Sequence, residues 1–232
     1  LNSEITADEI VTAVKHLNIN KSSFGPLVPA NLVYGLYYLL PYFIKLFNKL
    51  FINGQFPESW SRSVLIPIHK KGNHNNPDNY RGIVLINVVS KIYISILNKR
   101  LTFFTDVYST INESQSGFRK GYCTADNAFI LYSVVMKYLS KKGRKLYVAF
   151  IDFKKAFDYV NRAKMYNVLQ HDGVNGHLLQ SIMALYKSVQ ICIKSTKYGN
   201  LSDYFSCPIG LRQGCNLSPL LFSIFINELA ID

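Results

Sequence analysis

Asp152 is the residue best placed to do chemistry, because it ends a segment of alternating character. In the run VAFIDFKKAFDYV (residues 148–160), Val148, Phe150 and Asp152 share one face of an expected strand. A carboxylate at a strand end suits Mg²⁺, which takes one or two carboxylates together with substrate phosphates. Nucleotidyl transfer uses two such ions about 4 Å apart. Asp152 alone cannot hold both, and the plain alternative is an Asp that caps a turn.

A second segment, GLRQGCNLSPLLF (residues 210–222), predicts a loop that leads into a helix. Gly210 and Gly214 suit a backbone that must approach a base pair closely or adopt positive φ. Ser218 and Pro219 are typical of an N-cap and a first helical position.

Together the two segments resemble motifs of non-LTR (LINE-type) retrotransposon reverse transcriptases. Residues 152–161 (DFKKAFDYVN) are similar to the first carboxylate motif of that family, and residues 210–219 (GLRQGCNLSP) to its template and nucleotide motif. The fingers motifs of the family are resembled in the same order by residues 56–72 (FPESWSRSVLIPIHKKG), 79–87 (NYRGIVLIN) and 112–121 (NESQSGFRKG). The resemblance covers nearly the whole chain.

The resemblance implies a role for each matching residue. Asp152 is implied as the catalytic metal ligand, with two Mg²⁺ ions in the complete enzyme. The implied nucleotide-binding residues are Lys70, Lys71, Arg81, Phe153, Phe157 and Gln213. The implied template-binding residues are Gln115, Phe118, Arg119, Arg212 and Gly214. Phe157 is implied to pack under the sugar and exclude a 2′-hydroxyl, and Arg81 with Lys70 or Lys71 to grip the triphosphate.

General chemistry makes these roles reasonable, and each has a plain alternative. Cationic donors stabilise the spread charge of a phosphoryl-transfer transition state, and Arg81 offers a permanently charged fork for phosphate oxygens. Lys70 and Lys71 would otherwise belong to a solvated basic loop, and Phe157 would be a core aromatic residue. Arg119 would be a surface arginine in the segment that leads into a helix.

The charge of the chain predicts an anionic partner. Its 232 residues are 49% hydrophobic, which allows a sizeable core, and carry a formal net charge of +12. The resemblance implies that the partners are an RNA template, a DNA primer and a dNTP. Contacts between cationic side chains and backbone phosphates position a nucleic-acid strand without reading its sequence. The oligomeric state stays open.

The cysteines and the apolar segments predict an intracellular protein, cytoplasmic or nuclear. Four cysteines lie scattered, without the spacing of a zinc site or a disulfide framework. We expect no signal peptide from the opening LNSEITADEI, and the most apolar stretch, residues 32–47, falls short of a membrane span. We therefore expect no membrane partner.

The expected elements define three regions. Residues 1–55 form a helical extension of the fingers, with helices over 7–18 and 30–52 and a break at Pro41. Residues 56–145 form the fingers, with strands over 64–68 and 83–86, a helix over 89–104, and a further helix through Ala128 and Val135.

The partial palm is expected over residues 146–232. It begins with a strand over 147–152 and continues with helices over 162–169 and 176–185, then a strand over 190–194. The fold class is therefore α+β, a right-hand polymerase with fingers and a partial palm and without a thumb.

The aromatic-x-Asp-Asp motif of the family has no match after Asp158. We therefore expect a fragment of an RNA-directed DNA polymerase that is inactive by itself. Two other interpretations stay open: a catalytically dead remnant that still binds nucleic acid, and another palm polymerase such as an intron maturase or an RNA-directed RNA polymerase.

Overall fold

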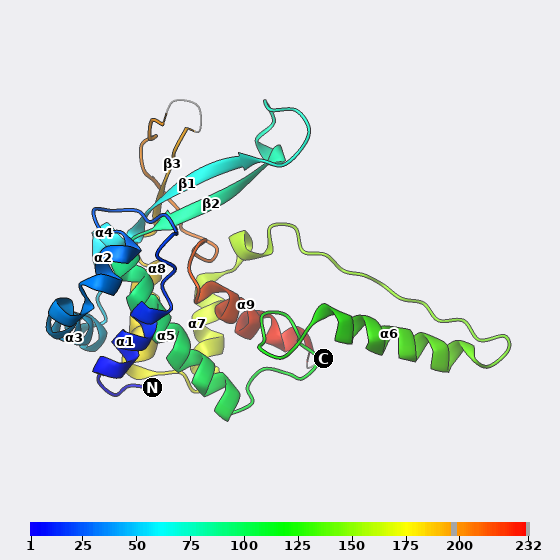
Figure 1. Ribbon diagram of the computed structural model, residues 1–232. Helices are drawn as coiled ribbons and strands as arrows, with labels where there is room; N and C mark the ends of the chain where they lie inside the picture. Colours follow the sequence, from blue (N-terminus) through cyan, green and yellow to red (C-terminus); the bar gives the residue numbers. More distant parts are fainter. Residues whose placement is uncertain (196–198, 231–232) are drawn as a thin grey trace.

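The structure, a computed structural model, describes residues 1–195 and 199–230, so the last two residues of the expected palm region lie outside it. It combines helices with one mixed sheet and confirms the α+β class (Figure 1). The division into three regions stays a prediction.

The amino-terminal helices are α1 (Ala7–Lys15), α2 (Pro29–Tyr34) and α3 (Leu36–Asn53). The predicted capping box opens α1: the Glu9 N–H donates to Thr6 Oγ1 over 3.3 Å, and the Thr6 N–H donates to Glu9 Oε2 over 2.9 Å. The predicted break at Pro41 is wrong, because Pro41 lies inside α3 and the helices separate at Gly35. Burial of the inner face of α3 outweighs the hydrogen bond that Pro41 cannot donate.

The sheet has the strand order β2-β1-β3-β4. Strand β1 (Arg62–His69) pairs antiparallel with β2 (Tyr80–Ile86), and on its other side pairs parallel with β3 (Gln190–Ile193). Strand β4 (Phe205–Ser206) closes the order against β3. Strands from the expected fingers and the expected palm therefore share one sheet.

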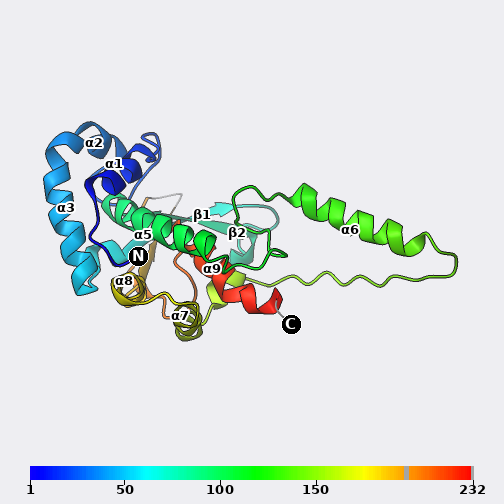
Figure 2. The same cartoon turned by 90° about the horizontal axis from the view of Figure 1, so that it is seen from below.

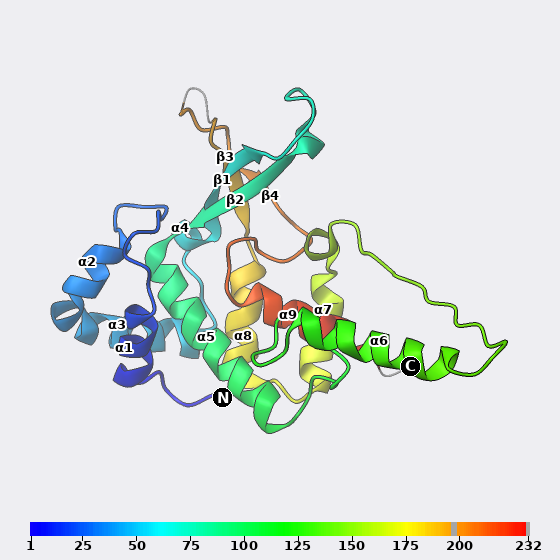
Figure 3. The same ribbon diagram turned by 45° about the vertical axis from the view of Figure 1, so that its right-hand side comes forward.

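Helices α5 (Val88–Val107), α8 (Gly176–Tyr186), α7 (Arg162–His171) and α9 (Ser218–Ile226) gather below the sheet in Figures 1 and 3. The short helix α4 (Glu58–Ser61) leads into β1. Helix α5 is the most deeply embedded, and its Tyr93 hydroxyl donates to Ser181 Oγ of α8 over 3.0 Å. Burial raises the pKa of Tyr93 to about 12, so the phenol stays protonated and keeps this bond.

Helix α9 begins one residue earlier than the sequence predicts. Ser218 is its first helical residue and Leu217 the N-cap, so the expected serine cap is wrong. The Ser218 hydroxyl instead donates to the Arg212 carbonyl over 2.7 Å, which ties the preceding loop to the helix.

Helix α6 (Thr124–Leu139) projects from the rest of the molecule, and residues 140–153 return beside it as an extended strap (Figures 1 and 2). The predicted strand over 147–152 is wrong: these residues form no regular element. A strand needs a neighbour for its backbone N–H and C=O groups, and none of the strands in the described ranges pairs with this segment.

Candidate nucleotide and template site

The two motifs that carry the sequence argument meet in the structure. A 3-10 turn, η2 (Ala156–Tyr159), lies against the loop before α9. The Leu211 N–H donates to the Phe157 carbonyl over 2.8 Å, and the Gly210 N–H donates to the Val160 carbonyl over 3.0 Å. These backbone bonds fix the relative position of two segments about fifty residues apart in the sequence.

Gln213 and Asp158 complete this junction with a side-chain bond. Gln213 Nε2 donates to Asp158 Oδ1 over 2.8 Å at an exposed position. Asp158 therefore pairs within the junction, and its carboxylate orients the amide that the sequence assigns to the nucleotide.

Two glycines allow the loop to approach its neighbours this closely. Both have positive φ, +77° at Gly210 and +76° at Gly214. A Cβ at Gly210 would lie 2.5 Å from the Asp158 carbonyl oxygen, and one at Gly214 would lie 2.6 Å from the Val84 carbonyl oxygen. Gly214 therefore seats the loop against β2.

Three aromatic rings from three motifs cluster at the junction. The Phe157 ring stacks on Phe222 of α9 with centroids 4.6 Å apart, and Phe118 meets its edge at 5.7 Å. Phe157 and Phe222 are half-buried against the core, whereas Phe118 is exposed. The three rings thus form a cluster in which Phe157 and Phe222 pack against the core, while Phe118 faces solvent. Sequence reasoning missed Phe222, which the apolar periodicity of α9 marks only as a core residue.

Arg162 is a second residue that sequence reasoning missed. Its guanidinium donates to four backbone carbonyls, with the shortest bonds going to Cys207 at 2.7 Å and to Gly210 at 2.8 Å. Burial lowers the pKa of Arg162, although the group remains charged at neutral pH. Arg162 therefore holds the loop that presents Gln213. In the sequence, the only feature that sets Arg162 apart is its position at the start of an expected helix.

The loop over residues 112–121 is anchored on α9. Gln115 Nε2 donates to the Ser223 carbonyl over 3.1 Å, and the Ser223 hydroxyl donates to the Gly117 carbonyl over 3.3 Å. Phe118 follows with φ +61°, an uncommon conformation for a residue with a side chain. The anchored backbone thus turns Phe118 toward Phe157.

Arg119 is engaged within its own loop. It donates to the carbonyls of Asn112 and Gln115 and pairs with Glu113 at 3.1 Å, and its guanidinium lies 4.2 Å from the centroid of the Tyr122 ring. The Tyr122 hydroxyl also donates to Glu113, and this hydrogen bond together with Arg119 lowers the pKa of the Glu113 carboxyl.

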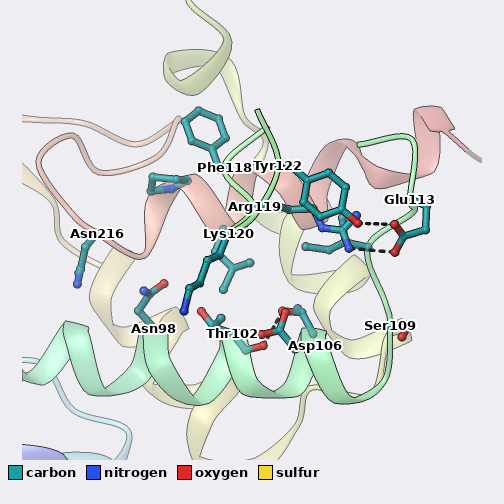
Figure 4. Close-up of a pocket in the computed structure, with 14 residues that line it drawn as sticks. Asn98, Thr102, Asp106, Ser109, Glu113, Phe118, Arg119, Lys120, Tyr122 and Asn216 are labelled. Carbon is teal, nitrogen blue, oxygen red and sulfur yellow. Dashed lines mark hydrogen bonds and ion pairs between the residues drawn. The ribbon is translucent and has the colours of Figure 1, made fainter. Parts of the chain in front are cut away.

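A pocket of about 500 Å³ lies between this loop and α5 (Figure 4). Figure 4 shows Lys120 reaching into it toward Asn98 and Thr102, with Asp106 beyond. The pocket therefore has a polar floor on α5 and a cationic edge on the loop.

The expected triphosphate cations lie at one end of the β1-β2 hairpin. Arg81 stands opposite Ile68 in the register, and the backbone N–H of Lys70 donates to the Asn79 carbonyl over 2.8 Å. The side chains of Lys70, Lys71 and Arg81 are exposed. Lys155 Nζ lies 3.7 Å from Asp78 Oδ1, an ion pair that links the hairpin loop to the turn of Phe157.

Asp152 and Phe153 lie on the exposed strap. Phe153 lines an apolar pocket of about 390 Å³ with Tyr159 and Phe222. Within residues 1–195 and 199–230, no group of three or more His, Cys, Asp or Glu side chains could hold a metal ion. The described residues thus supply one carboxylate where two ions were expected, and they do not by themselves fit that metal pair.

Arg212 lies in the interior, only 2% exposed. Its guanidinium donates to the Trp60 carbonyl and lies 5.6 Å from the centroid of the Phe56 ring, while Nε and Nη1 have no partner among the described residues. Burial lowers its pKa. Its guanidinium offers no surface to a strand in solvent, in contrast with Gln213 beside it.

Comparisons with known proteins find similar chains among the reverse transcriptases. A family model described as "Reverse transcriptase (RNA-dependent DNA polymerase)" matches residues 68–232. The probable RNA-directed DNA polymerase from transposon BS of Drosophila melanogaster is 27% identical over 97% of this chain and 25% of its own length. The RNA-directed DNA polymerase from mobile element jockey of the same species is 28% identical over 98% and 25%. A Pol polyprotein from the retrotransposable element R2 of Popillia japonica is 28% identical over 77% and 24%.

The chain belongs to the reverse transcriptase family, and its relatives among retrotransposons confirm the resemblance to the non-LTR group. It spans about a quarter of the length of these relatives. No helix in the part of the chain that the structure describes is long and apolar enough to cross a membrane.

Proposed function

We propose that this chain forms the nucleotide- and template-binding part of an RNA-directed DNA polymerase. The junction between the turn of Phe157 and the loop of Gln213 carries the proposal. Its backbone hydrogen bonds hold the exposed Gln213 loop against the turn of the stacked Phe157 ring. The Lys155–Asp78 ion pair links this turn to the cationic hairpin.

The proposed roles follow from exposure and charge. Phe157 contacts the sugar of the incoming dNTP, and Gln213 lies along the nucleotide and the paired template base. Arg81, with Lys70 or Lys71, binds the triphosphate, because a planar guanidinium matches phosphate oxygens and an ammonium adds a point charge. Phe118 offers its exposed ring to a template base, for which stacking tolerates any sequence.

Arg212, Arg119 and Gly214 act on the template indirectly in this proposal. Arg212 supports the Gln213 loop from the interior, Gly214 seats that loop on β2, and Arg119 shapes the turn that presents Phe118. Asp152 is proposed as a ligand for Mg²⁺. A divalent ion would neutralise phosphate charge, and the described residues alone give no complete site for it.

Binding by residues 1–232 tests the proposal. Anisotropy of a fluorescein-labelled RNA·DNA primer–template should show tight binding that weakens steeply with salt. Addition of the next complementary dNTP should slow dissociation of the primer–template, because the nucleotide contacts protein and template together. A mismatched dNTP should not.

Gln213→Ala and Arg81→Ala should each remove the dNTP effect, with Gln213→Ala sparing primer–template binding. Lys187→Ala is the matched control, because Lys187 is an exposed cation just past α8. An equal response to matched and mismatched dNTP would contradict the proposal and leave nucleic-acid binding without nucleotide selection.

A further inference from the structure

A row of exposed tyrosines lies on the face of α2 and α3 that turns away from the core. Tyr34, Tyr37, Tyr38 and Tyr42 are 72–82% exposed. We call these four residues the tyrosine face. Helix α3 lies at one edge of the molecule, with α5 and α8 between it and α9, so the face is remote from the candidate site (Figures 1 and 2).

The core does not explain these tyrosines. The inner face of α3 is already formed by Phe43, Phe47, Leu50 and Phe51, all buried. On the outer face, Tyr38 and Tyr42 are continued by Lys45 and Lys49 at positions i+7 and i+11 from Tyr38, which places all four in one stripe. The stripe runs about 16 Å along the helix at 1.5 Å per residue.

The rings are arranged to leave open faces. Tyr37 and Tyr38 meet edge to face, with centroids 5.2 Å apart and planes at 86°. With Pro41, Tyr42 and Lys45 they line an open hollow of about 630 Å³. Flat groups could enter this hollow and stack on a ring without displacing any buried side chain.

The charge along the segment that carries the tyrosine face has one sign. No Asp or Glu occurs between Glu9 and Glu58, whereas this interval contains four lysines. A second copy of a chain with net charge +12 would be repelled from such a surface. The complementary partner is therefore an anion that also presents flat, stackable groups.

We propose that the tyrosine face, with Lys45 and Lys49, binds single-stranded RNA as a second contact outside the polymerase groove. Aromatic rings that stack bases, combined with cations that follow the backbone, form the general recognition mode for unpaired strands. The choice of RNA over single-stranded DNA rests on the proposed function, in which the template is RNA. Such a contact would hold template that has not yet entered the groove.

The test measures binding of a labelled oligouridylate of about 12 nucleotides, a length within the range of single-strand sites. The protein is residues 1–232 carrying Lys70→Ala, Lys71→Ala and Arg81→Ala, which weakens the groove. In this background the further pair Tyr38→Ala and Tyr42→Ala should weaken binding at least about tenfold, since stacking contributes about 1–3 kcal/mol per base.

Two control pairs separate stacking from other effects. Tyr38→Phe with Tyr42→Phe keeps both rings and should retain binding within about twofold. Tyr108→Ala with Tyr132→Ala removes two exposed tyrosines elsewhere and should change nothing. Lys45→Gln with Lys49→Gln should lower the salt slope by about 1.4, because single strands contribute about 0.7 per neutralised phosphate.

Unchanged RNA affinity in the double alanine variant would overturn the inference. Loss of binding to anionic lipid vesicles without loss of RNA binding would overturn it too and mark a membrane contact. Weaker RNA binding by the alanine pair, found together with no dNTP effect at the junction, would support the tyrosine face while the polymerase proposal fails.

Discussion

At the scale of single residues, the position of Phe157 allows a core contact and the proposed sugar contact together. Its ring packs on Phe222 and the core, yet its turn lies beside Gln213 at the exposed junction. The sequence offered a core aromatic and a sugar contact as alternatives. A half-buried ring at this junction is compatible with both, since packing on Phe222 would hold the ring in place for the proposed sugar contact.

Phe157→Ala should admit ribonucleotides, because the side chain that meets the 2′-hydroxyl is removed. We expect the preference for dNTP over NTP to fall at least about tenfold, in the range that one hydrophobic pocket contact contributes. Single-nucleotide incorporation by a longer chain that contains these residues measures it. Phe157→Tyr keeps the ring and should keep most of the preference; an unchanged preference in Phe157→Ala would refute the sugar contact.

Arg212 shows what motif reasoning could not supply. A sequence motif indicates that a residue matters, but burial depends on Trp60 and Phe56, which lie some 150 positions away. Arg212→Ala should lower the free energy of unfolding by about 2–4 kcal/mol, through the lost volume and the lost bond to Trp60. Arg212→Met fills the space without an unpaired charge and should cost far less. Chemical denaturation measures both, and equal loss in the two variants would contradict the packing explanation.

At the scale of elements, Arg100 joins α5 to the amino-terminal segment. Its guanidinium pairs with Glu9 at 2.7 Å and donates to the carbonyls of Leu1, Ser3 and Glu4. Partial burial raises the pKa of Glu9, but the hydrogen bond and charge of Arg100, with the Thr6 N–H, outweigh burial and leave it below the ordinary value of 4.5.

This pKa shift sets how the stability gained from the ion pair between Arg100 and Glu9 depends on pH. A carboxyl whose pKa is depressed by folding contributes stability that is present above its unfolded value and lost as pH falls through the folded value. The free energy of unfolding should therefore decline from about pH 4.5 downward. In Glu9→Gln this component of the decline should disappear, and denaturation at pH 3 to 7 measures it. An identical pH profile in Glu9→Gln would contradict a stabilising role for the ion pair between Arg100 and Glu9.

The elements also show where sequence reasoning works. Helix α1 with its capping box, β1, β2, α5, α7, α8 and β3 lie where periodicity predicts them, because each element buries an apolar stripe against neighbours in the described part. Residues 147–152 have the alternation of a strand but no partner strand there. Alternation predicts which faces can be buried and carries no information about the strand that would bury them.

At the scale of the whole molecule, the candidate site is where segments distant in sequence meet. They are the β1-β2 hairpin, the loop over residues 112–121, the turn of Phe157 and the loop of Gln213. The pairing of the Phe157 turn with the Gln213 loop follows from motif order and resemblance. Phe222, Arg162 and the Lys155–Asp78 pair required the structure, because each depends on a tertiary neighbour and not on local pattern. Exposed cations lie on the hairpin and on α3 beside the tyrosine face, and nucleic acid is the partner that we propose for both surfaces.

RNA-templated primer extension by the longest reading frame that contains these residues tests the central claim most directly. The wild type should add complementary dNTPs, and Asp152→Ala should abolish addition while primer–template binding stays within about twofold, since one carboxylate contributes little to backbone contacts. Residues 1–232 alone should add none. Extension by Asp152→Ala at the wild-type rate, or by residues 1–232 alone, would contradict the placement of the reaction centre.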